Sequence, residues 1–403
     1  MTMRSRITKP VFGFLLASLI LSFGVSFLNP IMSMLLVNEK GLSPFYMGIF
    51  ITMMTLLKII VGHMSGVLGD QRNNRRSILL VSQWFTMIGL CGLIFMDNYW
   101  FLLCVVAPVL AIGGMGSSQL LGLGRLYSDS MVHSDTNHST YLISWMRAAI
   151  TVAWVIGPPA VFFIIVQWGF TWSLITAIGL SFLVWLSVHI YIPNFETHLQ
   201  NTDSNHSAGA WLDNRPLLVV LFINAAVNVA NNLYTISMPL YLTDTLHLEA
   251  SWAGYLFGVA AGIEVLFALL TGYLVTRIGK ERLVGISLLC GAIFYGALLA
   301  LDTPLLLIVI QLFNAAFIGI ATGLLLVIVQ DKMTKQPALA STLYTNSMRV
   351  GSMLAGLIAG TVSEYFGYKA VFIISLGFTC IGIVLIKWLK QPVHLDNELS
   401  RSI

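Results

Sequence analysis

The chain has 403 residues, of which 57% are hydrophobic and only 9% are charged, whereas ordinary soluble domains carry roughly 25% charged residues. A soluble protein of this size cannot cover that much apolar surface, so lipid must surround most of the chain. The net charge of +4 does not indicate nucleic-acid binding, because Lys and Arg form short clusters between apolar runs. The four cysteines lie inside those runs, where we expect free thiols rather than a metal site or disulfide bonds.

Membrane-spanning helices are predicted wherever an apolar stretch reaches about 20 residues, the length that crosses a hydrocarbon core of about 30 Å. The first stretch follows Arg4, Arg6 and Lys9 as a signal peptide would, but it is too long for one and no small-residue cleavage site closes it. The alternation of a β-barrel is absent, so we expect an all-α polytopic membrane protein. The twelve predicted helices cover residues 11–37, 44–66, 77–96, 100–124, 140–166, 170–192, 216–241, 251–275, 283–301, 304–330, 338–362 and 367–389.

One long polar segment, 193–215, divides these helices six to six. We interpret it as a cytoplasmic linker between an N-terminal half, 1–192, and a C-terminal half, 216–403, which ends in a short cytoplasmic tail. With the N-terminus in the cytoplasm, sixteen of the 21 Lys and Arg residues fall on the cytoplasmic side. Only Lys40 and Lys369 fall on the other side, and three basic residues lie within spans. This positive-inside bias places both termini in the cytoplasm.

An internal repeat supports the division into halves. The loop between the second and third helices reads Gly66-x-x-x-Asp70-x-Arg72-x-x-Arg75-Arg76. Its counterpart between the eighth and ninth helices contains Gly272, Thr276, Arg277, Gly279, Lys280 and Arg282, so that position 66 corresponds to 272, an offset of 206 residues. Two halves with the same loop at the same place are typical of a rocking transporter built from parallel repeats.

This loop resembles the signature loop of the major facilitator superfamily, although Gln71 and Asn73 depart from its usual pattern. The resemblance implies the twelve-helix major facilitator fold and a gating role for this loop. An aspartate at a helix end can accept hydrogen bonds from arginines and helix N-termini, and so can latch two halves together. The alternative is an ordinary basic loop that only sets topology. The predicted gating residues are Gly66, Asp70, Arg72, Arg76, Gly272, Arg277 and Arg282.

Longer segments resemble the bacterial sugar efflux transporter family within that superfamily. They are MRAAITVAWVIGPP at 146–159, GVAAGIEV at 258–265 and QLFNAAFIGIATG at 311–323, with LYSDS at 126–130 and PLYLTDTLHL at 239–248. The resemblance implies proton-linked export of glucose, lactose or related glycosides and analogues. It also suggests that Gly157-Pro158-Pro159 belongs to the glycine-proline element typical of exporters, which would kink and seal the fifth helix. An ordinary packing kink is the alternative.

Charges within predicted spans are the sharpest local signal, because each costs at least ~2.5 kcal/mol at a helix centre unless it is paired or hydrated. Glu264 is the one acid that we place within the membrane, and Arg147, Lys58 and Arg349 are the bases. In the superfamily's fold the fifth and eighth helices face each other, so we predict that Glu264 and Arg147 form a pair that couples transport to protons. The alternatives are a static ion pair, and for Lys58 a side chain that reaches toward the cytoplasm.

Sugar recognition needs neutral donors and acceptors together with an aromatic platform. The seventh helix carries four asparagines at offsets that share one helical face, and the superfamily's first, fourth, seventh and tenth helices line its central cavity. These polar residues could instead hold helices together. The predicted substrate-binding residues are Asn224, Asn228, Asn231, Asn232, Gln119, Asn29, Gln311, Asn314, Trp154 and Tyr234.

The sequence therefore predicts a secondary transporter in the bacterial inner membrane rather than an enzyme. Its expected partners are a small sugar, protons and the lipid bilayer, with no nucleic acid, metal or cofactor, and we expect it to act as a monomer. A drug or multidrug exporter, or a sugar importer of the same fold, is the alternative. A membrane-embedded enzyme or receptor is a further alternative, but no nucleophile–base set, metal motif or large extramembrane domain supports it.

Overall fold

The computed structural model describes residues 9–72, 74–131, 136–194, 210–334 and 336–389, and every regular element within these ranges is a helix. The all-α prediction is therefore confirmed. The longer helices are α1 (Lys9–Leu28), α3 (Pro44–Arg72), α4 (Arg75–Phe95), α7 (Gly116–Met131), α8 (Thr136–Trp168), α9 (Phe170–Tyr191), α10 (Arg215–Leu240), α11 (Ser251–Ile278), α12 (Lys280–Ala300), α14 (Gln311–Asp331), α15 (Pro337–Phe366) and α16 (Tyr368–Leu389).

Eleven segments within the described residues are long and apolar enough to cross a membrane. The twelfth predicted span, 338–362, is the 30-residue helix α15. It is less apolar than the others because Thr345, Asn346, Ser347 and Arg349 follow one another closely in its centre. Packing on its neighbours α3, α10 and α16 places it among the other spanning helices.

Four predicted spans are not continuous α-helices. The first breaks after α1 at Asn29–Ile31, where Pro30 cannot donate a backbone hydrogen bond, and resumes as α2 (Met32–Met34) and a π-helical turn, Leu35–Glu39. The fourth breaks between α6 (Ala107–Gly113) and α7, after the short α5 (Tyr99–Phe101) and a π-helical turn. The tenth breaks between α13 (Pro304–Val309) and α14, and the seventh ends in a π-helical turn, Tyr241–Thr245.

The repeat seen in the sequence extends to these irregular turns. The π-helical turns Leu35–Glu39 and Tyr241–Thr245 start at residues 35 and 241, the same 206-residue spacing that separates Asn38 from Asp244. Those two side chains touch, because Asn38 Nδ2 donates a hydrogen bond to Asp244 Oδ1 at 3.1 Å. Equivalent points of the repeat therefore meet at one end of the molecule.

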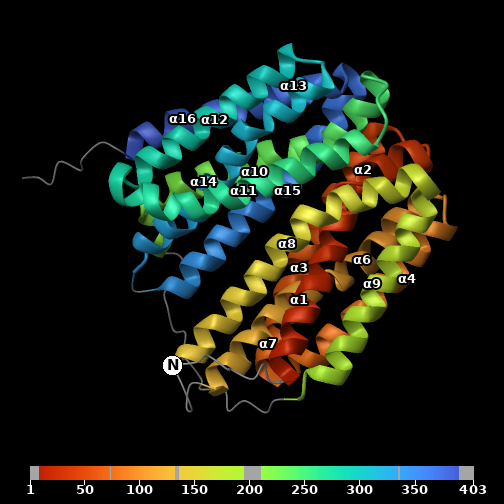
Figure 1. The fold of residues 1–403 in the computed structure, drawn as a ribbon, viewed down its shortest axis with the longest axis vertical. Helices are drawn as coiled ribbons and strands as arrows, with labels where there is room; N and C mark the ends of the chain where they lie inside the picture. Colours follow the sequence, from red (N-terminus) through yellow and green to blue (C-terminus); the bar gives the residue numbers. More distant parts are fainter. Residues whose placement is uncertain (1–8, 73, 132–135, 195–209, 335, 390–403) are drawn as a thin grey trace, which may run out of the picture.

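Figure 1 shows two bundles, α1 to α9 and α10 to α16, which meet near α2 and diverge toward the end where α7 lies. The contacts between bundles cluster at the meeting end. There α3 approaches α15 closely, since a Cβ on Gly48 would lie 2.6 Å from Gly360 Cα. The backbone amide of Phe45 donates to Glu364 Oε2 at 3.1 Å across the same seam. Most of the predicted linker lies outside the described residues.

Candidate functional site

The second seam between the bundles joins α8 and α11, the fifth and eighth predicted spans. A Cβ on Gly254 would lie 3.0 Å from Phe162 Cβ, and one on Gly258 would lie 2.5 Å from Pro159 Cγ. The contacts advance in opposite directions along the two helices, so α8 and α11 are antiparallel. The glycine-proline element of α8 thus lies directly against a glycine of the other bundle.

This register fixes the relation between the two predicted coupling residues. Gly258 lies beside Pro159, and Glu264 follows Gly258 by six residues on α11. Because the helices are antiparallel, Glu264 lies level with about position 153 of α8. Arg147 precedes that position by another six residues on α8. That offset is about 9 Å at 1.5 Å per residue. Within the part of the chain that the structure describes, no ion pair joins them, and Arg147 is exposed while Glu264 is half-buried. The side chain of Glu264 packs on α14, since a Cβ on Gly319 would lie 3.2 Å from Glu264 Cγ.

The asparagine face of α10 points in part toward α15. Asn224 is fully buried, and its Nδ2 donates to Tyr344 O at 3.1 Å and to Ser347 Oγ at 2.7 Å. Asn228 donates to Asn224 O at 2.9 Å and lies against Gly351. In this conformation Asn224 joins α10 to α15 by hydrogen bonds, whereas Asn228 bonds within α10 and packs against α15. Of the remaining two, both half-buried, Asn232 donates back to Asn228 O at 2.8 Å.

A second buried polar group joins α10 to α14. Tyr234 donates its hydroxyl to Gln311 Oε1 at 3.3 Å, and Asn314 donates to the same oxygen at 3.0 Å. Oδ1 of Asn314 and the hydroxyls of Ser237 and Tyr295 are buried with no hydrogen-bond partner among the described residues. Tyr234 is enclosed by Phe257, Phe294 and Phe372, so it lies in an aromatic core rather than at an open stacking surface.

Gln119, Asn29 and Trp154 belong to the N-terminal bundle. Gln119 is buried and donates to Ser65 O at 3.1 Å, while its Oε1 accepts from Arg75 at 3.3 Å. Asn29, at the break after α1, is exposed, and Trp154 on α8 is 37% exposed. Asn29 and Trp154 are therefore the more accessible members of the predicted set.

The two predicted gating loops make contacts within their own bundles. Arg76 donates to Ile192 O at 2.6 Å and to His189 O at 3.1 Å, which caps the end of α9. In the second loop, Arg277 lies 4.8 Å from the Tyr273 ring centroid, and Lys280 pairs with Asp331. Gly66 is half-buried, Gly272 and Arg282 are exposed, and the side chains of Asp70 and Arg72 lie outside the described set.

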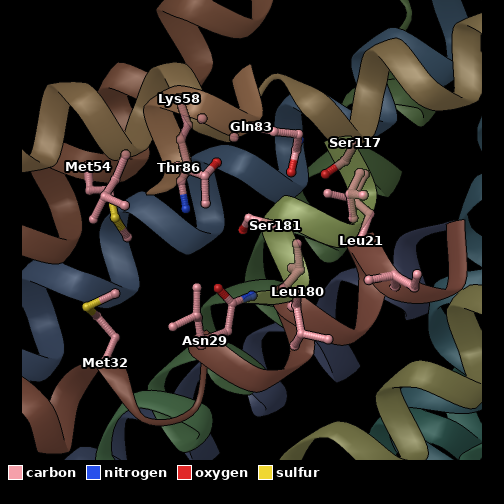
Figure 2. Close-up of a pocket in the computed structure, with 18 residues that line it drawn as sticks. Leu21, Asn29, Met32, Met54, Lys58, Gln83, Thr86, Ser117, Leu180 and Ser181 are labelled. Carbon is pink, nitrogen blue, oxygen red and sulfur yellow. The ribbon is translucent and has the colours of Figure 1, made fainter. Parts of the chain in front are cut away.

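The surroundings of Lys58 were not predicted from the sequence. Lys58 of α3 lines a cavity of about 100 Å³ inside the N-terminal bundle, together with Asn29, Gln83 and Thr86. Figure 2 shows Lys58 and Thr86 pointing into this pocket from one side and Asn29 from the other. The internal repeat did contain a signal for this position. Residues 58 and 264 are 206 residues apart, the same spacing that relates Asn38 to Asp244. A lysine therefore stands in one half where the other half has Glu264.

Comparison with known proteins agrees with this architecture. The chain matches the Major Facilitator Superfamily over residues 14–345 and again over 217–402. It is 31% identical over 397 residues to sugar efflux transporter A of Escherichia coli strain K12, covering 97% of this chain and 99% of that protein. Sugar efflux transporter C of the same organism is 30% identical over 384 residues, with 94% and 95% covered. The crystal structure of the nucleoside transporter NupG superposes with a TM-score of 0.75 at 13% identity, covering 95% of this chain and 99% of that one, and shows the shared fold alone.

Proposed function

The chain belongs to the bacterial sugar efflux transporter family of the major facilitator superfamily, and on that premise we propose that it exports small sugars by alternating access. The observation that carries the proposal is the similarity to two proteins named as sugar efflux transporters over nearly the whole chain. The substrates that fit the proposal are glucose, lactose or related glycosides and analogues. As a multi-pass bacterial membrane protein, it would act from the inner membrane with both termini in the cytoplasm.

The conformation supports alternating access in physical terms. The bundles touch at the end that holds Asn38, Gly48, Asp244 and Gly360, and Figure 1 shows them diverging toward the other end. In the proposed orientation the touching end faces away from the cytoplasm, so this state would receive substrate from the cytoplasm. Rocking about the two seams, α3 with α15 and α8 with α11, would then expose the substrate on the opposite side.

Proton coupling is proposed to run through Glu264. An acid within a membrane span is costly unless it is paired or protonated, which makes such residues typical carriers in proton-driven transporters. Glu264 and Arg147 lie on opposite sides of the α8–α11 seam, displaced by about 9 Å along the axis. A sliding or rocking motion of this seam would bring the two side chains together in one state and separate them in the other. Proximity of the Arg147 guanidinium would favour the ionised carboxyl of Glu264, and separation would favour the protonated form.

The accessible polar residues are proposed to meet the sugar first. Asn29, Asn231 and Asn232 are only partly covered in this state, and Trp154 offers an exposed ring. Asn224, Asn228, Gln119, Gln311, Asn314 and Tyr234 are engaged within the helix packing, so a direct role requires that their hydrogen bonds exchange for sugar hydroxyls during the transport cycle.

Export is tested by the accumulation of a labelled non-metabolisable galactoside in intact cells. Overproduction should lower the steady-state level of the galactoside relative to cells with the empty vector. A higher level would favour the importer alternative. If the galactoside level is unchanged while a cationic dye accumulates less, the drug-exporter alternative is correct. Membrane fractions should be checked for equal amounts of protein in each culture.

A further inference from the structure

The cavity of the N-terminal bundle carries a charge that the packing does not balance. The described residues that line it include Lys58 but no Asp or Glu. The stem of Lys58 packs on the break between α6 and α7, since a Cβ on Gly114 would lie 3.3 Å from Lys58 Cε. This contact holds the ammonium within the bundle rather than at the cytoplasmic end of α3. An ammonium in a membrane span needs a counter-charge or water to offset its desolvation.

The charged groups near Lys58 do not supply that counter-charge. On α15, the helix that packs along α3, the guanidinium of Arg349 lies next to Gly62, within 3.9 Å of where its Cβ would be, so the neighbouring charge is also positive. Glu264 packs against Gly319 in the other bundle. Among the described residues, no hydrogen bond or ion pair is made by the Lys58 ammonium.

Three of the other polar side chains that line the cavity donate hydrogen bonds to neighbouring helix atoms. Thr86 donates its hydroxyl to Ser82 O at 3.0 Å, and Ser181 donates to Ala177 O at 3.0 Å. Gln83 Nε2 donates to Ser82 Oγ at 3.2 Å. These groups therefore present acceptor lone pairs to the cavity, which suit the hydroxyl donors of a polyol. Lys58 contributes donors and a full positive charge.

We infer that this cavity binds the carboxylate end of a sugar acid, with Lys58 as the counter-ion and Thr86, Ser181 and Gln83 as acceptors for adjacent hydroxyls. The inference rests on the proposed sugar-transport function and specifies its substrate class. A lone ammonium matches the single charge of a carboxylate, whereas a phosphate dianion would remain half neutralised. The volume of about 100 Å³ is below the roughly 150 Å³ that holds a benzene ring, so one end of a hexose enters it and the rest lies toward Asn29.

The test compares two ligands that differ at one carbon. Glucuronate has a carboxylate where glucose has a hydroxymethyl group, and binding of both to purified protein is measured by isothermal titration calorimetry. We expect glucuronate to bind about tenfold more tightly than glucose, which corresponds to about 1.4 kcal/mol. Lys58→Gln should bring the ratio of the two affinities to about one, and Lys58→Arg should keep most of the preference. Lys387→Gln, which removes a lysine from the exposed end of α16, should behave as wild type.

Several results of these binding measurements would overturn the inference that the cavity binds a carboxylate. Equal binding of glucose and glucuronate by the wild type overturns the inference and leaves sugar transport standing. Equal loss of both ligands in a folded Lys58→Gln protein also overturns it, because Lys58 would then serve the cavity's structure. Tighter binding of glucose 6-phosphate than of glucuronate would replace the carboxylate by a phosphate and refute the stated class. If neither ligand binds, the inference falls, and the galactoside assay then decides separately whether sugar export stands.

Discussion

Asn38 and Asp244 occupy the same position in the two halves of the chain, 206 residues apart, and they are joined by a hydrogen bond of 3.1 Å. Related positions can touch only where the pseudo-symmetry axis passes between them. The contact therefore marks the axis at the end where the bundles touch, and in the proposed cycle this bond would break when that end opens.

The symmetry of this pair allows a swap experiment. Asn38→Asp places two carboxylates about 3 Å apart and should favour the open outer end. We expect a cysteine introduced at Thr52, just below the closed end, to react several-fold faster with an impermeant maleimide. Adding Asp244→Asn should restore the slow rate, because the hydrogen bond is then rebuilt with its partners exchanged. Glu39→Gln, on the adjacent exposed position, is the control. An unrestored rate in the double variant would refute the pairing as a gate.

Glu264→Gln keeps the shape of the side chain but cannot carry a proton. We expect it to abolish sugar transport driven by an imposed pH gradient in proteoliposomes while sugar exchange without a gradient persists. Arg147→Ala should slow gradient-driven transport without abolishing it, because the carboxyl that carries the proton is still present. Concentrative transport by the Gln variant would make Glu264 a structural residue.

Gly48 permits the closest approach between α3 and α15. A Cβ there would lie 2.6 Å from Gly360 Cα, so Gly48→Val cannot close this seam without moving a helix. Transport should fall by at least tenfold while the protein still inserts and purifies in folded form. Gly296→Ala is the matched control, because its Cβ would meet no atom within 4 Å. Normal transport by Gly48→Val would show that the seam need not close this tightly.

Asp302 lies in the turn between α12 and α13, where it accepts hydrogen bonds from the Tyr241 hydroxyl at 2.7 Å and from Lys369 Nζ at 3.0 Å. The bond from Tyr241, followed by the bond from Lys369, lowers the pKa of Asp302 below its ordinary value of 3.8. A carboxyl whose pKa is lower in the folded state adds stability above its unfolded pKa, and this is lost as the pH falls through the folded pKa.

For this exposed pair, solvent screening limits the stabilisation to about 0.5 kcal/mol. Asp302→Asn should therefore lower the melting midpoint in detergent by about 1 °C at neutral pH. The difference from wild type should vanish when the pH falls well below 3.8. Asp213→Asn, which removes an exposed carboxylate near the start of α10, provides the control. A difference that persists in acid would mean that the shape of the side chain matters more than its charge.

Orientation is tested with single cysteines in a protein that otherwise lacks cysteine. A cysteine at Lys369 should react with an impermeant maleimide added to intact cells, and one at Arg282 should react only after the membrane is permeabilised. These positions lie at opposite ends of the C-terminal bundle, at the starts of α16 and α12. The reverse pattern would invert the proposed topology and with it the direction assigned to the open end.

The sequence predicted helix positions closely where apolarity alone decides them. The predicted span 170–192 corresponds to α9, Phe170–Tyr191. It did not predict the breaks after Leu28 and Val309, because an apolar run has the same hydropathy whether or not its backbone bonds are continuous. Pro30 was a visible signal for the first break; the second, near Ile310, carries no comparable residue.

Side-chain partners were harder to predict than spans. The spacing of Asn224 and Asn228 fixed a common face but could not say whether α15 or a cavity lies opposite. That depends on the rotation of α10 about its axis, which long-range packing determines. For Lys58, in contrast, the sequence did contain the needed information, because the repeat relates its position to that of Glu264. Extending the aligned loop backward by eight residues, from Gly66 to Lys58, would have revealed it.

The glycine-proline element also constrains how the N-terminal bundle can move. Ser26 of α1 donates its hydroxyl to Ala153 O of α8 at 2.9 Å, and Gly157 leaves room for that hydroxyl one turn later. This contact joins the first and fifth spans midway along their length, so a relative slide of the two helices would have to break the hydrogen bond. A movement of α8 at Pro159, where it packs on α11, would therefore also move α1 and the residues of α1 that line the Lys58 cavity.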